Sequence, residues 1–148
     1  MDRALKLARQ AKGGVAPRPA VGAVVVKNGI VIGEGATQRR PGQHAEAIAL
    51  SKAGNQTKGA TIFCSLEPHA FQGMAAPCTE AIINSGITTV VSPLEDPNPR
   101  VSGNGYRQLK ASGIEVIREC SPNQRLEAEQ LIEGFSHHIK TGLPMVTV

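Results

Sequence analysis

Two apolar segments joined by Asn28-Gly29 constrain the possible folds of this chain more than any other feature. Residues 21–27 and 30–35 both have the apolar character of strands, and Asn-Gly between two such runs is a strong signal for a tight hairpin turn. The two segments are therefore expected to form antiparallel strands. The rest of the chain must be added to a sheet that contains this hairpin.

After the hairpin, helical and strand patterns alternate three times. Strands that are joined by helices run parallel, with right-handed crossovers. The expected helices are residues 2–12, 44–53, 77–85, 106–111 and 122–140, and the further strands are residues 60–66, 87–92 and 114–117. The last helix is expected to have Leu126, Leu131, Ile132 and Phe135 on its apolar side. The predicted fold class is α/β, a three-layer α/β/α sandwich with a mixed sheet of about five strands.

Composition and charge exclude several classes of protein. A length of 148 residues suits one domain, and three cysteines do not suggest a disulfide framework; Cys64 is expected in the core. The net charge of +4 is not gathered in a block, and aromatic residues make up only 3% of the chain, so a nucleic-acid partner is not expected. Without a membrane-length apolar run or a signal peptide, the chain is predicted to be cytoplasmic, with no membrane contact.

Three residues with metal-binding side chains lie close to the starts of expected helices. His44 opens one helix, and Cys78 follows Pro77 at the start of the next, where the positive end of the helix favours a thiolate. His69 lies in the loop between them and is either a third ligand or a surface residue. Zinc binds imidazole nitrogen and thiolate sulfur, and a catalytic zinc keeps a fourth position for water. Glu46, two positions after His44, could then move protons.

Several sequence motifs resemble one known family. The chain reads H-A-E at 44–46, L-E-P at 66–68 with C-T-E-A-I-I-N-S-G-I from 78, D-P-N-P at 96–99 and V-x-G-x-G at 101–105. The first part is similar to the zinc-dependent deaminase signature, H-x-E followed by P-C-x-x-C. The longer spacing and the later motifs resemble the deaminase domain of the bifunctional riboflavin-biosynthesis deaminase/reductase, in the cytidine deaminase-like superfamily.

The resemblance implies a cytidine deaminase-like fold and a specific set of site residues. It implies Zn²⁺ held at the positions of His44, His69 and Cys78, with Glu46 as the acid/base. It further implies that Asp96 and Asn98 bind the substrate. Three other substrate-binding positions of the family are replaced in this chain: Arg18 replaces Asn, Thr37 replaces His, and Met74 replaces a basic residue expected to meet the phosphate. His69 also replaces a Cys ligand. Fold and metal chemistry are therefore better supported than the substrate.

Some residues near these motifs can be interpreted in more than one way. Asp96 and Asn98 could simply form Asx turns beside proline, and without the resemblance this is the preferred reading. Glu67 is either a substrate contact or a charge at the end of a strand. Gly103-x-Gly105 is not a dinucleotide fingerprint, because Gln108 stands where a glycine would be needed, and it indicates turn chemistry instead.

The predicted function is zinc-dependent deamination of an aminopyrimidine nucleotide in riboflavin biosynthesis, 2,5-diamino-6-ribosylamino-pyrimidinone 5′-phosphate by resemblance. The alternatives are a deaminase of another nucleobase or nucleoside, or a catalytically silent zinc domain used in assembly; the intact Glu46 favours an enzyme. Residues 1–141 are expected to form the deaminase domain. Residues 142–148 resemble the hinge to an absent reductase domain, so the chain is either a natural single-domain form or cut at the hinge. A homo-oligomer is possible.

Overall fold

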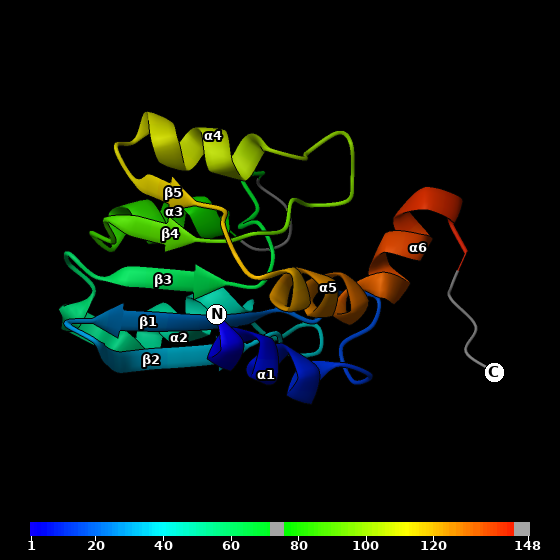
Figure 1. Ribbon diagram of the computed structural model, residues 1–148, viewed down its shortest axis with the longest axis horizontal. Helices are drawn as coiled ribbons and strands as arrows, with labels where there is room; N and C mark the ends of the chain where they lie inside the picture. Colours follow the sequence, from blue (N-terminus) through cyan, green and yellow to red (C-terminus); the bar gives the residue numbers. More distant parts are fainter. Residues whose placement is uncertain (72–75, 144–148) are drawn as a thin grey trace.

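The strands form one mixed sheet of five. The computed structural model describes residues 1–71 and 76–143. Its strands are β1 (Gly22–Lys27), β2 (Ile30–Ala36), β3 (Thr61–Cys64), β4 (Thr89–Val91) and β5 (Glu115–Ile117), in the order β2-β1-β3-β4-β5. Strand β1 is antiparallel to both of its neighbours, whereas β3, β4 and β5 are parallel (Figure 1). The predicted mixed sheet and its antiparallel hairpin are confirmed.

The hairpin turn has the backbone conformation that its sequence predicts. Asn28 has a φ of 52° and Gly29 a φ of 76°. Two central residues with positive φ are what a two-residue turn of type I′ requires, and Asn-Gly adopts it at the lowest cost. Lys27 pairs with Ile30 directly across the turn. The local sequence therefore sets the register at the start of the hairpin.

Helices cover both faces of the sheet. The helices are α1 (Asp2–Ala11), α2 (Ala45–Ala53), α3 (Cys78–Asn84), α4 (Asn104–Ala111), α5 (Pro122–Leu131) and α6 (Glu133–Thr141), with a short 3₁₀ turn at Gly54–Gln56. A side chain at Gly22 would lie 1.9 Å from a carbonyl oxygen of α1, and one at Gly35 would lie 2.6 Å from a carbonyl oxygen of α2. Since Gly22 pairs with Ala36, the residue after Gly35, these glycines lie on opposite faces. The sheet is thus the middle layer of an α/β/α sandwich.

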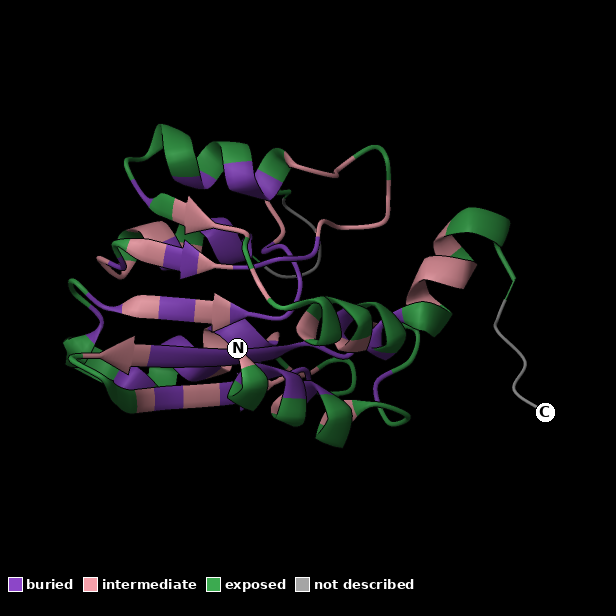
Figure 2. Ribbon diagram, viewed as in Figure 1, coloured by how far each residue is buried: buried purple, intermediate pink, exposed green. Residues whose placement is uncertain are grey.

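Small and aliphatic side chains fill the core on both sides of the sheet. The largest apolar side chains that are fully buried are Leu5, Val25, Ile62, Ile82, Val90 and Leu109. Cys64 is also buried there, as predicted. Figure 2 shows this burial running along the central strands and the inward faces of the helices. With no Trp and few aromatic residues in the chain, close approach of helices to small residues takes the place of bulky packing.

The prediction of one helix from 122 to 140 is wrong. The helix breaks at Ile132, whose φ of −109° and ψ of 14° are not helical, and α6 leaves at an angle from α5 (Figure 1). Ile132 is buried in the core, and Gly134 follows just after the break. Burial of Ile132 and the low helix propensity of glycine together account for the change of direction.

The expected apolar side of this region is only partly correct. Leu131 and Ile132 are buried, and Phe135 packs against the core, but Leu126 is 53% exposed. Helix α5 presents Ala128 and Leu131 to the core. Leu126 is two positions before Ala128, which places it about 200° around the helix, on the solvent side.

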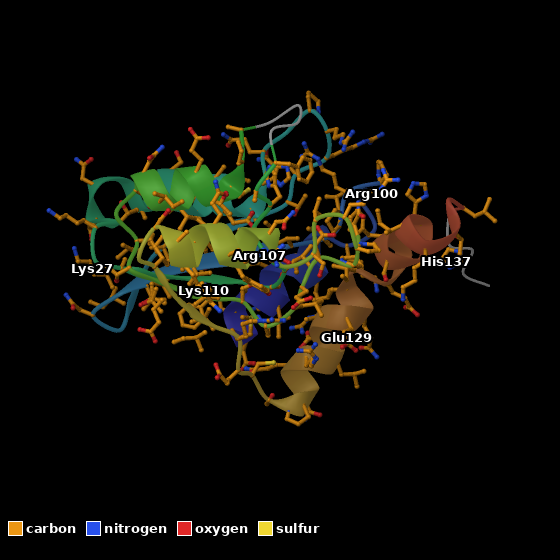
Figure 3. The ribbon with its side chains drawn as sticks, turned by 90° about the horizontal axis from the view of Figure 1, so that it is seen from above. Lys27, Arg100, Arg107, Lys110, Glu129 and His137 are labelled. Carbon is orange, nitrogen blue, oxygen red and sulfur yellow. The ribbon has the colours of Figure 1, made fainter. Side chains whose placement is uncertain are left out.

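The carboxyl ends of the parallel strands define one end of the molecule. Lys27, beside the β1–β2 turn, and His137, on α6, lie at opposite ends (Figure 3). Strands β3, β4 and β5 point towards the α6 end (Figure 1). Open α/β sheets bind ligands at this edge. Within the described ranges no helix is long and apolar enough to cross a membrane. The division at residues 141 and 142 stays a prediction, because 144–148 lie outside the described residues.

Candidate metal centre

Helix α2 carries the first metal-binding residue and the acid. His44 is the N-cap of α2, with extended backbone angles, and its carbonyl oxygen accepts the N–H of Ile48. Glu46 lies in the first turn and is buried, with 4% of its surface exposed. The free N–H groups at this end of a helix favour a negative charge. The expected helix start at His44 is confirmed.

The other two metal-binding residues lie on the next connection of the chain. Pro77 is the N-cap of α3 and Cys78 its first residue. His69 belongs to the loop after β3, and its carbonyl oxygen accepts the N–H of Thr79 at 3.2 Å. This hydrogen bond holds the His69 loop against the start of α3. Residues nine positions apart along the chain are thereby brought to the same place.

The structure brings the three predicted ligands together. One ligand atom each from His44, His69 and Cys78 lies within 4.8 Å of the other two. The two imidazole rings stack with their centroids 4.7 Å apart. Two imidazole nitrogens and one sulfur that converge in this way match the donors that zinc prefers, and a single ion could contact all three. His69 is therefore not an isolated surface residue.

The electrostatic surroundings favour the metal-binding form of both histidines. The pKa of His44 is lowered to about 4, first by burial and then by the nearby His69, Arg18 and Arg40. Burial also lowers the pKa of His69. Both rings are consequently neutral at physiological pH and have a lone pair available for a metal.

Cys78 does not have the lowered pKa that its helix position suggested. Burial raises the pKa of the Cys78 thiol, and the carboxyl group of Glu46 raises it further. The thiol donates a hydrogen bond to Glu46 Oε2 at 3.7 Å. The positive end of a short helix does not outweigh these two effects, so a bound cation is needed for Cys78 to ionise at neutral pH.

A pocket of about 210 Å³ opens beside these residues. His44, Glu46 and His69 line it, together with the apolar side chains of Leu66 and Phe71. Arg18, Arg40, Glu67, Asp96 and Phe135 also line it. The ring of His69 contacts Phe71 edge-to-face, with centroids 5.3 Å apart. The pocket thus combines a metal centre, a buried acid and apolar surface, which are the features of a small-molecule site.

The predicted substrate-binding residues fall into three groups. Arg18 and Asp96 line the pocket, as expected of substrate contacts. Thr37 and Asn98 do not: Thr37 is buried, and its Oγ1 accepts the N–H of Val21 at 3.0 Å. Met74 lies outside the described residues.

The D-P-N-P loop contains the Asx turns that its residue types predict. The N–H of Asn98 donates to Asp96 Oδ1 at 2.9 Å, and the N–H of Arg100 donates to Asn98 Oδ1 at 3.1 Å. Asp96 is half-buried, and burial raises its pKa. The loop is therefore held by its own side chains, and it presents Asp96 to the pocket.

Glu67 is a buried residue of the pocket whose role the sequence left undecided. Its carboxylate accepts the backbone N–H groups of Asp96 and Gly103 on Oε1, both at 3.0 Å, and that of Gly105 on Oε2 at 2.9 Å. It is buried and fastens the Asp96 loop and the start of α4 to the chain beside His69. The available signal was an acid directly after an apolar strand, together with a distant Gly-x-Gly that offers free N–H groups.

The chain matches known proteins over most of its length. Residues 1–93 match the family described as the cytidine and deoxycytidylate deaminase zinc-binding region. The chain is 42% identical to the diaminohydroxyphosphoribosylamino-pyrimidine deaminase of Buchnera aphidicola (Acyrthosiphon pisum), covering 97% of this chain and 96% of that protein. It is 43% identical to riboflavin biosynthesis protein RibD of Escherichia coli, covering 99% of this chain but only 39% of that protein.

A solved structure shows the same fold. Acinetobacter baumannii RibD is 40% identical and superposes with a TM-score of 0.89, over 97% of this chain and 40% of that one. The chain thus spans about two fifths of the length of these two longer relatives. The predicted cytidine deaminase-like fold and the resemblance are both confirmed. This chain therefore belongs to the cytidine and deoxycytidylate deaminase zinc-binding family, in its riboflavin-biosynthesis branch.

Proposed function

We propose that this chain catalyses the hydrolytic deamination of an aminopyrimidine ribosyl phosphate, the activity named for the Buchnera relative. The observation that carries the proposal is that His44, His69 and Cys78 converge while Glu46 and both histidines line one pocket. Three ligands and a buried acid are what metal-assisted hydrolysis of an amine requires. The family and the relatives support the same reaction.

The residues have separate roles in this reaction. His44, His69 and Cys78 would hold Zn²⁺, which when bound activates a water for attack on the ring carbon that carries the amine. Glu46 removes a proton from the water and delivers protons to the ring nitrogen and to the departing ammonia. Burial raises the pKa of Glu46, which makes its carboxylate a better proton acceptor than that of an exposed glutamate.

The walls of the pocket would position the substrate. Arg18 and Asp96 offer a cation and an acceptor to its polar groups, and Leu66 and Phe71 offer apolar contact to its ring. Thr37 and Asn98 act indirectly, because their side chains accept the backbone N–H groups of Val21, just before β1, and of Arg100, just after the D-P-N-P motif.

The test is ammonia release by the zinc-loaded protein from a panel of aminopyrimidine nucleotides, together with nucleosides and free bases. Glu46→Gln should keep the zinc and the fold but lose about 10²–10⁴-fold in turnover, the usual contribution of a general acid/base. Glu80→Gln is a matched control, because Glu80 is exposed on α3. Near-normal turnover by Glu46→Gln would show that another group moves the protons.

The alternatives give different results in the same experiment. A deaminase of another nucleobase or nucleoside would release ammonia only from compounds without the ribosyl phosphate. A silent zinc domain would bind the metal and release none. His69→Ala tests the metal ligands independently of the choice between these functions. If this variant bound zinc and turned over substrate like the unmodified protein, His69 would not be a ligand.

A further inference from the structure

Arg18 reaches across the chain to brace the loop at 38–42. Its Nη1 donates to the carbonyl oxygen of Gln38 at 3.0 Å and to that of Gly42 at 2.6 Å. These two bonds use both hydrogens of Nη1. Among the described residues, Nε and Nη2 have no hydrogen-bond acceptor, so three of the five donors of this guanidinium remain available. The side chain is held in place while three of its five N–H donors are free.

Arg40 adds a second cation at the same pocket. It lies on the loop that Arg18 braces and lines the pocket together with it. Within the described ranges neither arginine forms a salt bridge with an acidic residue. The pKa of Arg18 is lowered by burial and then by Arg40, as expected of two cations that lie close together without an anion between them.

The carboxylates of the pocket are not paired with these two arginines. Glu67 already accepts three backbone N–H groups, Asp96 accepts the N–H of Asn98, and Glu46 receives the Cys78 thiol. All three therefore have their own partners. Among the described residues, the two guanidinium groups at the pocket are therefore left without an anionic partner.

We infer that Arg18 and Arg40 form an anion subsite that binds the phosphate of the substrate. This inference rests on the proposed function, because it assigns one part of the proposed substrate to one part of the pocket. A phosphomonoester carries a charge of about −1.5 to −2 and three acceptor oxygens, which match two guanidinium groups. Arginine binds such oxygens through two parallel N–H groups, and the fixed position of Arg18 reduces the entropy lost on binding.

The kinetic test compares a phosphorylated substrate with the same nucleoside after removal of its phosphate. Arg18→Gln and Arg40→Gln should each raise KM for the nucleotide about tenfold, the effect of losing one charge-assisted hydrogen bond. Both variants should lower kcat/KM for the nucleotide by a larger factor than kcat/KM for the nucleoside, because only the nucleotide carries the phosphate. Arg18→Lys keeps the charge but loses the planar fork, so its KM should lie between those of the unmodified protein and Arg18→Gln.

Two controls separate binding from general charge and from folding. Lys27→Gln removes one positive charge at the opposite end of the molecule from the α6 end and should leave KM unchanged (Figure 3). Arg40 makes no side-chain hydrogen bond within the described residues, so Arg40→Gln should keep the melting temperature even if Arg18→Gln loosens the 38–42 loop. An equal rise in KM for nucleotide and nucleoside in Arg40→Gln would overturn the subsite.

A direct binding measurement keeps the inference separate from the proposed function. Titration calorimetry with ribose 5-phosphate should show binding to the unmodified protein that weakens about tenfold in either glutamine variant and decreases with added salt. If no aminopyrimidine is deaminated but this binding is seen, the proposed function fails and the subsite stands. If deamination occurs but ribose 5-phosphate binds all variants equally, the subsite fails and the function stands.

Discussion

At the scale of single residues, two buried glutamates of the pocket differ through their partners. Glu46 faces a thiol, which is a weak donor, and burial raises its pKa. Glu67 instead accepts three backbone N–H groups, which compensate its carboxylate for the loss of water. The same residue type is thus proposed for proton transfer at one position and holds two loops together at the other.

Glu67→Gln should lower the melting temperature and raise KM. An amide has one acceptor oxygen, so at least one of the three N–H groups loses its acceptor, at a cost of about 1.5–3 kcal/mol for a bond to a charged group. In a chain of this size that corresponds to a drop of roughly 4–10 °C in thermal unfolding. KM should rise because the backbone of Asp96 loses its anchor.

Glu80→Gln is the control for this variant, because Glu80 is exposed and surface substitutions usually change stability by less than about 0.5 kcal/mol. Equal unfolding temperatures for the two variants would mean that Glu67 does not hold the D-P-N-P loop.

At the scale of elements, helices α4 and α6 have the same residue type at the same position but different surroundings. Gly105 is the second residue of α4, and a side chain there would lie 2.0 Å from the carbonyl oxygen of Pro68. Gly134 is the second residue of α6, and a side chain there would meet nothing within 4 Å. The start of α4 is pressed against the chain next to His69, whereas the start of α6 stands free.

The two glycines should therefore respond to alanine in opposite ways. Gly105→Ala should destabilise the protein by about 1–3 kcal/mol, because backbone rather than a side chain must move to admit the methyl group. Gly134→Ala should be neutral or stabilise by up to about 1 kcal/mol, because alanine favours the helix. Urea unfolding of both variants measures this difference. Destabilisation of similar size at both positions would contradict the packing described for α4.

At the scale of the whole molecule, the three candidate metal ligands come from separate segments that the fold brings together. His44 starts α2, His69 lies on the loop after β3 and Cys78 starts α3. A metal that binds these ligands only in the folded state stabilises that state. The metal is thus expected to contribute to the stability of the pocket edge as well as to its chemistry.

Removal of the metal should lower the melting temperature of the unmodified protein. Metal analysis should find about one zinc per chain, and Cys78→Ser should lose most of it. A chelator should lower the melting temperature of the unmodified protein but have little effect on Cys78→Ser. Cys120→Ser is the matched control, since Cys120 lies outside the ligand cluster. An unmodified protein without zinc would refute the three-ligand site.

Sequence by itself determined the features that depend on neighbouring residues. Asn28-Gly29 fixes a hairpin because its two residues adopt positive φ at low cost. The sequence also predicts that His44 and Cys78 lie at helix starts. Gly54 marks the end of the helix that His44 opens, and Pro77 marks the start of the helix that contains Cys78. The ligand types, two imidazoles and one thiol, follow from residue identity alone and predict zinc, and the matching family is described as a zinc-binding region.

Tertiary structure alone decided the features that depend on distant segments. The position of β1 between β2 and β3, the N–H groups that bind Glu67 and the carbonyl oxygens that hold Arg18 all involve residues far apart in the chain. The break at Ile132 is of the same kind, because burial of that side chain in the core overrides a locally helical pattern. Such contacts form only when folding brings the segments together, so no local pattern encodes them.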